Sequence, residues 1–438
     1  MKNILKKSWI LFSLFSVAIS FPLKAVEIDS TNSKRVALNA FSRYSGKTLG
    51  ELKIIQKIPV THQDTTVFHV YNFENGFVIV AANDVSEPVL GFGLTQPFDF
   101  NDMPPALQDL LENYKQEIVQ AKRQNTKKSQ GISEKWTEYL DTTPSRALYM
   151  PATWLVETTW GQDSGSVSGS NIAYNHYCPL DAQGHKTVLG CGAVALAQIL
   201  NYWRCRVHPQ GTARCKLPNG DTVSINFANQ TYNWGGMIPN EANTTNALFL
   251  YHCAVALNSI FGSRKNGGTE SYPTNVPSTL TTYFGFTDTI YYKNSYSDQN
   301  WIDSLKKNID NRRPVFYAGS GNNGGHGWVI DGYNSGNYFH CNWGWRGSYN
   351  DWYLLSNLTA GGHNLNNNQR AIVDIYPTYY SNLPLKNMTI TSNTYTGHTI
   401  TVENSTIQNN ANVILDADCV VEIFGNFEVP VGATLEIK

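Results

Sequence analysis

A cysteine at the start of a helix-forming run is the feature that most constrains this fold. Cys191 opens segment 191–203, which is rich in Ala and Leu, has no Gly beyond Gly192 and meets no Pro until Pro209. This composition predicts a buried helix with Cys191 at its N-terminus. There, exposed backbone N–H groups and the positive end of the helix dipole stabilise a negatively charged sulfur.

A histidine from a distant part of the chain completes the pattern. His326 lies 135 residues after Cys191, follows two glycines and begins the strand-like run 327–331. A neighbouring imidazole converts a thiol, whose ordinary pKa is near ~8.5, into a nucleophile. The spacing lies in the range of papain-like enzymes. Taken singly, however, a cysteine in such a helix is more often a small buried apolar residue.

Three blocks in one order carry a family resemblance. Segments 191–202, 324–333 and 342–347 together resemble the streptopain family of secreted bacterial cysteine peptidases. The resemblance implies that Cys191 is the nucleophile and His326 the general base. It also implies a papain-like catalytic domain in two parts, one helical and one an antiparallel β half.

The resemblance implies roles for three further residues. Trp343 matches the tryptophan that replaces the orienting asparagine of papain-type enzymes, and Asn342 is the alternative orienter. Gln162, in segment 159–163, matches the glutamine that donates to the oxyanion. A fixed neutral amide suits that task because it stabilises charge developing on the carbonyl oxygen, by roughly 3 kcal/mol.

Some features depart from the family pattern or leave a choice open. Gly192 follows the nucleophile where a small branched residue is expected, and 205–215 forms an extra loop. The seven cysteines are an odd number, as expected if one is a free nucleophile. Cys205 and Cys215, ten residues apart, are the pair best suited to a disulfide. His340 is an alternative base, although its alternating neighbours indicate a strand interior.

A glycine-rich segment, 319–325, precedes the histidine. We expect it to be too long and flexible for a simple hairpin and to border the substrate cleft through Gly324 and Gly325. No Lys-Ser/Thr follows the glycines, so they do not indicate a phosphate-binding loop. The sequence has no CxxC pair and no HExxH, so neither a metal site nor a cofactor is expected.

The N-terminus predicts export. Lys2, Lys6 and Lys7 precede the apolar run 10–19, which is too short to span a bilayer and suits a signal peptide over residues 1–25. No later run is apolar enough for a transmembrane helix. The net charge of −1 gives no reason to expect nucleic acid as a partner. These observations favour a secreted protein.

The rest of the 438-residue chain divides into three regions by pattern. Residues 26–146 resemble an inhibitory propeptide of α+β type, with a hairpin over 66–80, a helix from Pro105 and a basic linker over 122–131; an independent binding domain is the alternative. Residues 147–380 form the catalytic domain, with short antiparallel strands near 314–318, 328–330, 338–341 and 352–355. Residues 381–438 repeat an apolar alternation 22 residues apart, which suggests stacked β-coils that serve attachment or stability, or merely extend the fold.

The sequence therefore predicts an α+β protein that is a secreted, zymogen-type cysteine endopeptidase. Its expected partners are protein or peptide substrates and its own propeptide as inhibitor. An amidase or cell-wall peptidase with the same Cys–His pair is the alternative enzyme. A non-catalytic inhibitor or surface-binding protein is the alternative of another class.

Overall fold

The computed structural model describes residues 25–141, 153–163, 172–292, 297–321, 324–356, 358–359, 369–378 and 382–438. The predicted signal peptide, apart from Ala25, lies outside these ranges. Within them, no helix has the length and apolar character needed to cross a bilayer. Three hydrophobic cores organise the described chain, and the C-terminal region has one of its own.

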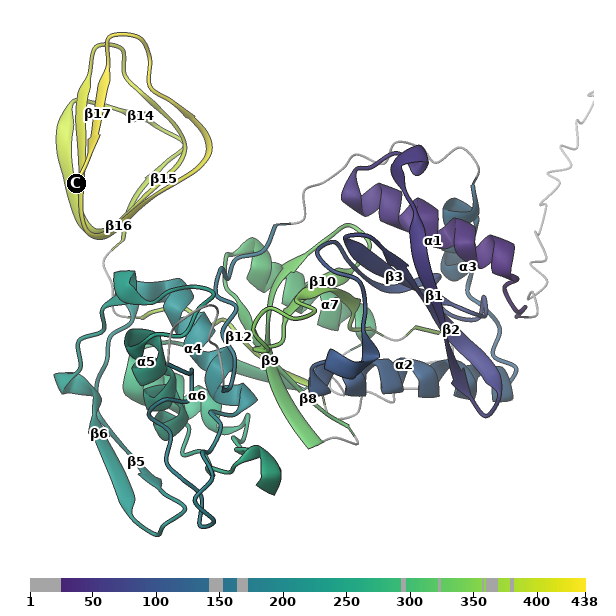
Figure 1. Ribbon diagram of the computed structural model, residues 1–438. Helices are drawn as coiled ribbons and strands as arrows, with labels where there is room; N and C mark the ends of the chain where they lie inside the picture. The colour runs from purple at the N-terminus through teal and green to yellow at the C-terminus, as the bar shows by residue number, and fades with distance from the viewer. Residues whose placement is uncertain are drawn as a thin grey trace, which may run out of the picture.

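The N-terminal region consists of a strand meander covered by helices (Figure 1). Its elements are α1 (Ser30–Ser45), η1 (Leu49–Glu51), β1 (Ile54–His62), β2 (Thr65–Phe73), β3 (Gly76–Ala81), β4 (Val89–Gly93), η2 (Phe100–Asp102), α2 (Pro105–Arg123) and α3 (Gln130–Leu140). The predicted hairpin is confirmed as β2 and β3. The helix predicted from Pro105 is confirmed as α2, since its apolar face is buried.

The predicted linker over 122–131 is shorter in the structure, where residues 124–129 connect two helices. α2 continues through Arg123, and α3 begins at Gln130, capped by the Ser129 hydroxyl, which accepts from the N–H of Ile132. α3 forms because Ile132, Trp136 and Tyr139 follow helical spacing and bury one face in the first core. The polar residues before them masked this short amphipathic pattern.

The helical half of the catalytic region surrounds the second core. Its elements are α4 (Cys191–Trp203), η3 (Arg204–Arg206), β5 (Thr212–Lys216), β6 (Thr222–Asn226), η4 (Phe227–Asn229), η5 (Trp234–Gly236), α5 (Thr244–Ala256), η6 (Arg264–Asn266), α6 (Asn275–Thr279) and the π-helical η7 (Leu280–Phe284). The central helix α4 packs against α5 on one side and against β9 on the other. This packing joins the two halves and confirms the buried helix predicted from Cys191.

The β half supplies antiparallel strands, as predicted. Its elements are β7 (Thr289–Tyr292), α7 (Asp298–Asp310), β8 (Val315–Gly321), β9 (Gly324–Tyr333), β10 (Tyr338–Asn342), β11 (Asp351–Leu354) and β12 (Arg370–Val373). The glycine-rich segment does not form a long loop. Its two ends are the paired tips of β8 and β9, with Gly321 opposite Gly324 and Gly319 opposite His326. Backbone pairing, which glycines permit, orders the described residues 319–321 and 324–325 of this segment.

One ten-stranded sheet joins the N-terminal region to the β half. The strand order is β1-β2-β3-β4-β11-β10-β9-β8-β12-β7. At the junction, β4 pairs with β11 through Phe92 opposite Trp352 and Gly91 opposite Tyr353. Without β4, β11 would be an edge strand with unpaired backbone groups. The first core likewise draws side chains from both regions.

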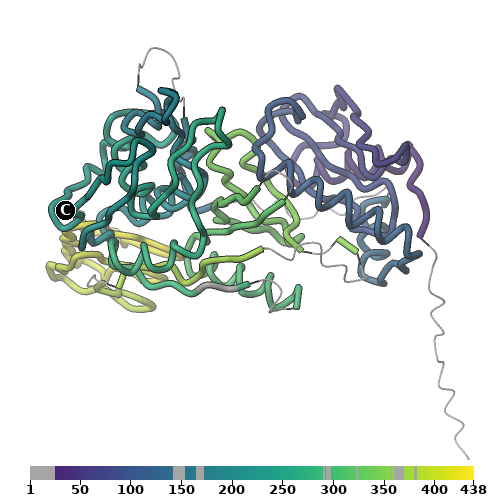
Figure 2. Tube along the Cα trace, turned by 90° about the horizontal axis from the view of Figure 1, so that it is seen from below, coloured from purple at the N-terminus to yellow at the C-terminus, as the bar shows by residue number. Residues whose placement is uncertain are grey.

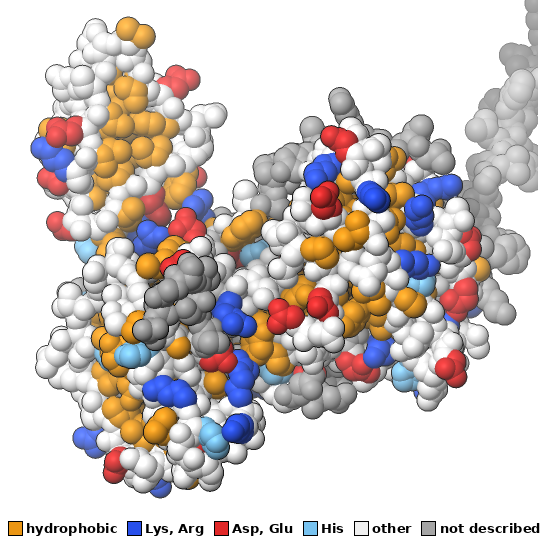
Figure 3. All heavy atoms as spheres, viewed as in Figure 1, with side chains coloured by type: hydrophobic (Ala, Val, Ile, Leu, Met, Phe, Trp, Pro, Cys, Tyr) orange, Lys and Arg blue, Asp and Glu red, His pale blue; other side chains and the backbone are white. Residues whose placement is uncertain are grey.

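The C-terminal region is a small coil of parallel strands, as its repeat predicted. It contains β13 (Asn382–Lys386), β14 (Thr389–Ile390), β15 (Asn393–Ile407), β16 (Asn412–Glu428) and β17 (Thr434–Ile437). Asn412 stands opposite Thr434, 22 residues later, and accepts a hydrogen bond from its hydroxyl. Hydrophobic side chains gather in the middle of the coil (Figure 3).

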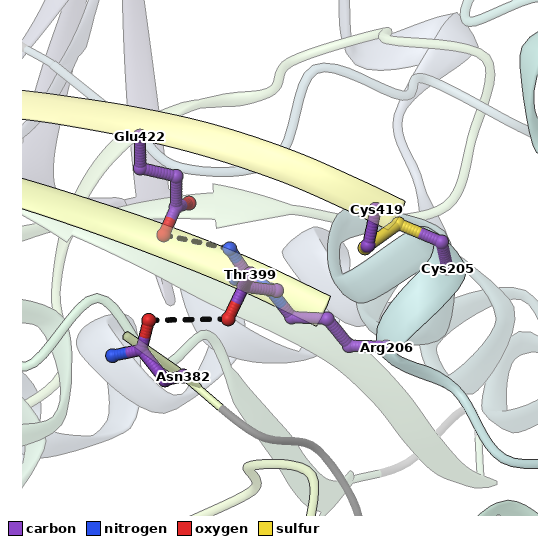
Figure 4. Close-up of a disulfide and its surroundings, with 6 residues drawn as sticks. All are labelled: Cys205, Arg206, Asn382, Thr399, Cys419 and Glu422. Atoms are coloured by element: carbon purple, nitrogen blue, oxygen red, sulfur yellow. Dashed lines mark hydrogen bonds and ion pairs between the residues drawn. A yellow bond between two sulfur atoms is a disulfide. The ribbon is translucent and has the colours of Figure 1, made fainter. Parts of the chain in front are cut away.

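The expected disulfide between Cys205 and Cys215 is wrong. Cys205, in η3 at the end of α4, is bonded to Cys419 of β16, which ties the coil to the helical half (Figures 2 and 4). An ion pair between Arg206 and Glu422, 2.6 Å long, lies beside it. Cys215 is buried, because the alternation of β5 turns its side chain into the core, where Sγ bonds the carbonyl of Ser259.

Candidate active site

The nucleophile candidate stands where the sequence predicted it. Cys191 is the first residue of α4 and follows Gly190, whose φ of 86° belongs to the region that favours glycine. The thiol accepts a hydrogen bond from the N–H of Gly327, 3.3 Å away on β9. Burial raises the pKa of Cys191, and the backbone N–H groups of Gly327 and Gly192 act in the opposite direction. The raised pKa means that this arrangement holds the thiol protonated.

The imidazole candidate is bonded to the N-terminal region. His326, on β9, places Nε2 3.3 Å from Oδ2 of Asp109 on α2. The two side chains are only 15% and 8% exposed. Burial lowers the pKa of His326, and Asp109 acts in the opposite direction. Cys191 and His326 therefore lie on neighbouring elements, but the thiol accepts from Gly327 and the imidazole contacts Asp109.

A cavity of about 570 Å³ brings most of the candidate residues together. Its lining from the catalytic region includes Gln162, Val188, Cys191, Gly192, Arg264, Thr269, Glu270, Ser271, Gly324, Gly325, His326, Gly327 and Trp345. Gly324 and Gly325 border it, in agreement with the sequence-based expectation. The first turn of α2 adds Pro105 and Gln108, so the N-terminal region forms part of the wall.

The oxyanion candidate reaches the same cavity. The backbone carbonyl of Gln162 accepts from the N–H of Leu189, two residues before Cys191, at 3.0 Å. This bond folds segment 159–163 back toward the start of α4, as a shared site requires. The structure thus places Gln162 in the lining with Cys191.

The two orienter candidates are buried behind the histidine strand. The Trp343 ring lies 5.2 Å from that of Trp328 on β9, and its indole N–H donates to the carbonyl of Tyr349. Asn342 donates to the carbonyl of Thr158 and accepts from Gln198. In this arrangement the imidazole faces Asp109, while Trp343 supports its strand through Trp328.

Sequence reasoning missed Gln198, which connects three blocks of the site. It is fully buried on α4, and its side-chain oxygen accepts from the N–H of Trp160 at 3.0 Å. Its side-chain N–H donates to Oδ1 of Asn342 at 3.1 Å. A signal was present, because Gln198 is the single polar residue in 192–200. A buried amide must find hydrogen-bond partners.

Sequence reasoning also missed Asp109. Its carboxylate is buried on a helix whose neighbours Leu107 and Leu110 belong to the core. A carboxylate at such a position requires a partner, and this could have marked it.

The departure at Gly192 has a steric cause. A Cβ at this position would lie 3.1 Å from the Cβ of Ser271, another residue of the cavity wall. The small residue lets that wall approach the nucleophile. Gly327 has a similar role on β9, where a Cβ would lie 2.9 Å from the ring of Phe316.

The alternative base, His340, lies in the interior of β10, as its neighbours indicated. Its Nδ1 lies 2.6 Å from Oδ1 of Asp331. Its ring stacks on that of Trp154 with 4.7 Å between the centroids. It is not among the residues that line the cavity with Cys191. These contacts give His340 a structural place in the sheet.

Two family models match the chain in succession. The model of the Spi protease inhibitor matches residues 25–118, and that of the Peptidase C10 family matches residues 169–353. The second match contains Cys191, His326 and Trp343. The first contains Asp109.

Individual proteins match across the same regions. The thiol protease/hemagglutinin PrtT of Porphyromonas gingivalis is 24% identical over 370 residues, which are 80% of this chain and 41% of that protein. The chain thus spans about two fifths of that relative's length. Streptopain of Streptococcus pyogenes is 24% identical over 342 residues, 70% of this chain and 80% of streptopain. A solved fragment of Prevotella intermedia prointerpain A has a TM-score of 0.59 and 26% identity, covering 74% of this chain and 99% of that fragment.

Proposed function

Because this chain belongs to the streptopain family of cysteine peptidases, we propose that it is a secreted endopeptidase made as a zymogen. The observation that carries the proposal is the cavity shared by Cys191 and His326, with α2 of the N-terminal region in its wall. In this assignment residues 1–25 direct export, 26–146 inhibit, and 147–380 carry the reaction. Residues 381–438 are an accessory coil.

The reaction uses few groups. Once His326 is free of Asp109, its imidazole takes the proton of Cys191, and the thiolate attacks the scissile carbonyl. The side-chain amide of Gln162 and the backbone N–H of Cys191 hold the oxyanion. His326 then protonates the leaving amine, and water hydrolyses the acyl-enzyme with His326 as base. Trp343 keeps the histidine strand in place through Trp328.

Latency follows from two contacts that α2 makes. Asp109 holds the imidazole at 3.3 Å, which keeps the base away from the thiol. Pro105 and Gln108 occupy the cavity wall, where a substrate would otherwise bind. A protonated thiol with a raised pKa completes an unreactive state.

Alkylation of Cys191 tests the enzyme assignment most directly. An E-64-type epoxide should add the mass of one reagent molecule to the processed protein, and peptide mapping should locate it on Cys191. Cys178 and Cys253 are internal controls, since both are buried and burial raises the pKa of each. Reaction at a control cysteine with Cys191 unmodified would contradict the assignment.

Substitution of the nucleophile provides a second test. Cys191→Ala should lower hydrolysis of casein on the order of 10⁵-fold, because the reacting groups act as a unit. Activity within tenfold of the parent would contradict the role of Cys191. Intact casein alongside rapid cleavage of cell-wall peptides would instead favour the amidase alternative.

A further inference from the structure

One exposed arginine lies where three parts of the cavity meet. Arg264, the first residue of η6, donates through Nε to Oδ2 of Asp163 at 2.5 Å. Its guanidinium carbon lies 4.6 Å from the centroid of the Trp345 ring. Arg264 and Trp345 line the same cavity as Cys191 and Gln162.

Each of the three residues belongs to a segment that carries a part of the site. Asp163 directly follows Gln162, the oxyanion donor. Trp345 belongs to the block 342–347 that contains Trp343. Arg264 precedes residues 267–273, which also line the cavity. A planar guanidinium suits this junction, because its edge can bond a carboxylate while its face covers an indole.

The other contacts of the oxyanion segment hold its backbone. The carbonyl of Gln162 accepts from Leu189, and that of Asp163 accepts from the N–H of Tyr174 at 3.0 Å. The carbonyl of Trp160 accepts from the N–H of Arg346 at 3.4 Å. The Asp163 side chain adds a contact with Arg264, a residue that lines the cavity.

The exposure of Arg264 and Asp163 indicates how their ion pair affects stability and catalysis. The side chains of Arg264 and Asp163 are 47% and 22% exposed. An ion pair at this exposure contributes little to the stability of the fold. A hydrogen-bond donor for an oxyanion, by contrast, is sensitive to displacements of about 1 Å. A contact that is weak in folding can therefore matter in catalysis.

We propose that Arg264 is a positioning residue for the oxyanion donor Gln162. It fixes the segment through Asp163 and fixes itself against Trp345, so that the Gln162 amide is aligned before substrate arrives. This inference rests on the role given to Gln162 in the proposed function.

Kinetics of processed enzyme variants test the proposal. Arg264→Met keeps the apolar stem but removes the ion pair and the cation–π contact. It should lower kcat about tenfold, the size expected for a misaligned group, with KM changed less than about twofold. Asp163→Asn should give the same loss from the other side of the pair. The rate of Cys191 alkylation should be unchanged in both variants, because the thiol and imidazole are untouched.

Two controls separate positioning from a general effect. Lys265→Met removes the adjacent cation of the same helix, whose Nζ faces His185 at 3.2 Å, and should leave kcat unchanged. Arg264→Lys keeps the charge but not the planar face, and should recover part of the lost kcat. A loss of kcat in Lys265→Met equal to that in Arg264→Met would overturn the proposal, since any charge change nearby would then suffice.

A double-mutant cycle with Gln162→Ala tests whether Arg264→Met lowers kcat through Gln162. Arg264→Met should cause no further loss of kcat in the Gln162→Ala background. An undiminished loss there, a change in KM alone, or an unchanged kcat in Arg264→Met would each overturn the proposal. If Gln162→Ala lowers kcat while Arg264→Met does not, the proposed function stands without this inference. If Gln162→Ala has no effect, the role of Gln162 fails and the inference fails with it.

Discussion

Nε2 of His326 lies 3.3 Å from Oδ2 of Asp109, so the candidate catalytic base is paired with a carboxylate of the N-terminal region. Both side chains line a small pocket between α2 and the sheet, together with Leu110 and Trp328. Through this contact the N-terminal region pairs with the candidate base, in addition to covering part of the cavity. The contact also explains why a carboxylate occupies the apolar face of α2.

Removal of the Asp109–His326 contact should make the Cys191 thiol of the precursor reactive. In the full-length chain, Asp109→Asn should speed alkylation of Cys191 by an E-64-type epoxide about tenfold. The physical reason is that loss of the partly buried carboxylate–imidazole contact frees the imidazole to approach the thiol. The measurement is the rate of mass shift at Cys191 before any processing occurs.

A neighbouring acid on the same helix provides the matched control. Glu112 pairs with Lys115, three residues along α2. Glu112→Gln should therefore leave the alkylation rate of the precursor at the parental value. Equal rates in the Asp109→Asn precursor and the parent would mean that latency depends on steric cover alone.

A second carboxyl is buried where β4 meets β11. Asp351 accepts from the N–H of Leu94, and a Cβ on Gly93 would come within 2.5 Å of its Oδ2. Burial raises its pKa to about 7, and nearby His340 acts in the opposite direction. The junction with the N-terminal region thus encloses a carboxyl that favours its protonated form.

The stability of the precursor should depend on pH through Asp351. The pKa of Asp351 rises from an ordinary value of about 3.9 to about 7 in the fold. The stability that its protonated carboxyl contributes to the fold is therefore fully present below about pH 4 and is lost as pH rises to about 7. The loss amounts to roughly 4 kcal/mol. In a Cys191→Ala background, Asp351→Asn should therefore gain stability over the parent as pH rises, by urea unfolding between pH 4 and 8.

The comparison of the two chains isolates this carboxyl from other titrating groups. His326, whose pKa burial lowers, makes the fold less stable as pH falls, but it does so in both chains. A pH-independent difference between Asp351→Asn and its parent would show that the carboxyl does not titrate in this range.

The oxyanion role makes a kinetic prediction. Gln162→Ala should lower kcat roughly 10²–10³-fold while KM changes little, because the amide acts mainly in the transition state. Alkylation of Cys191 should continue at the parental rate, since no oxyanion forms in that reaction. A change confined to KM would make Gln162 a substrate-binding residue.

Local patterns in the sequence predicted several elements of the fold. Helix α4, the β2–β3 hairpin, the strands of the β half and the parallel coil each follow from periodicity or repeats within short segments. The gathering of Cys191, Gln162 and His326 at one cavity was expected only through the family resemblance. Nothing in the local pattern of Gln162, an isolated polar residue, distinguishes it from a surface glutamine.

Contacts between distant segments were the part that sequence could not supply. Three contacts join residues more than 200 positions apart: the pairing of β4 with β11, the Asp109–His326 contact and the Cys205–Cys419 disulfide. The two cysteines of the disulfide are 214 positions apart. Cysteine spacing favoured the near partner, Cys215, because short loops close easily. The structure favours the far one because β5 turns Cys215 inward and the coil packs beside η3.

The disulfide between Cys205 and Cys419 should stabilise the protein without affecting the reaction. Replacing both cysteines with Ala should lower the free energy of unfolding by about 2–4 kcal/mol, since a long loop is no longer closed in the unfolded chain. The nucleophile lies at the opposite end of α4, roughly 20 Å away along the helix. The kcat of the double variant should therefore stay within twofold of the parent. Urea unfolding and casein hydrolysis measure the two quantities, and a large fall in kcat at unchanged stability would instead couple the coil to catalysis.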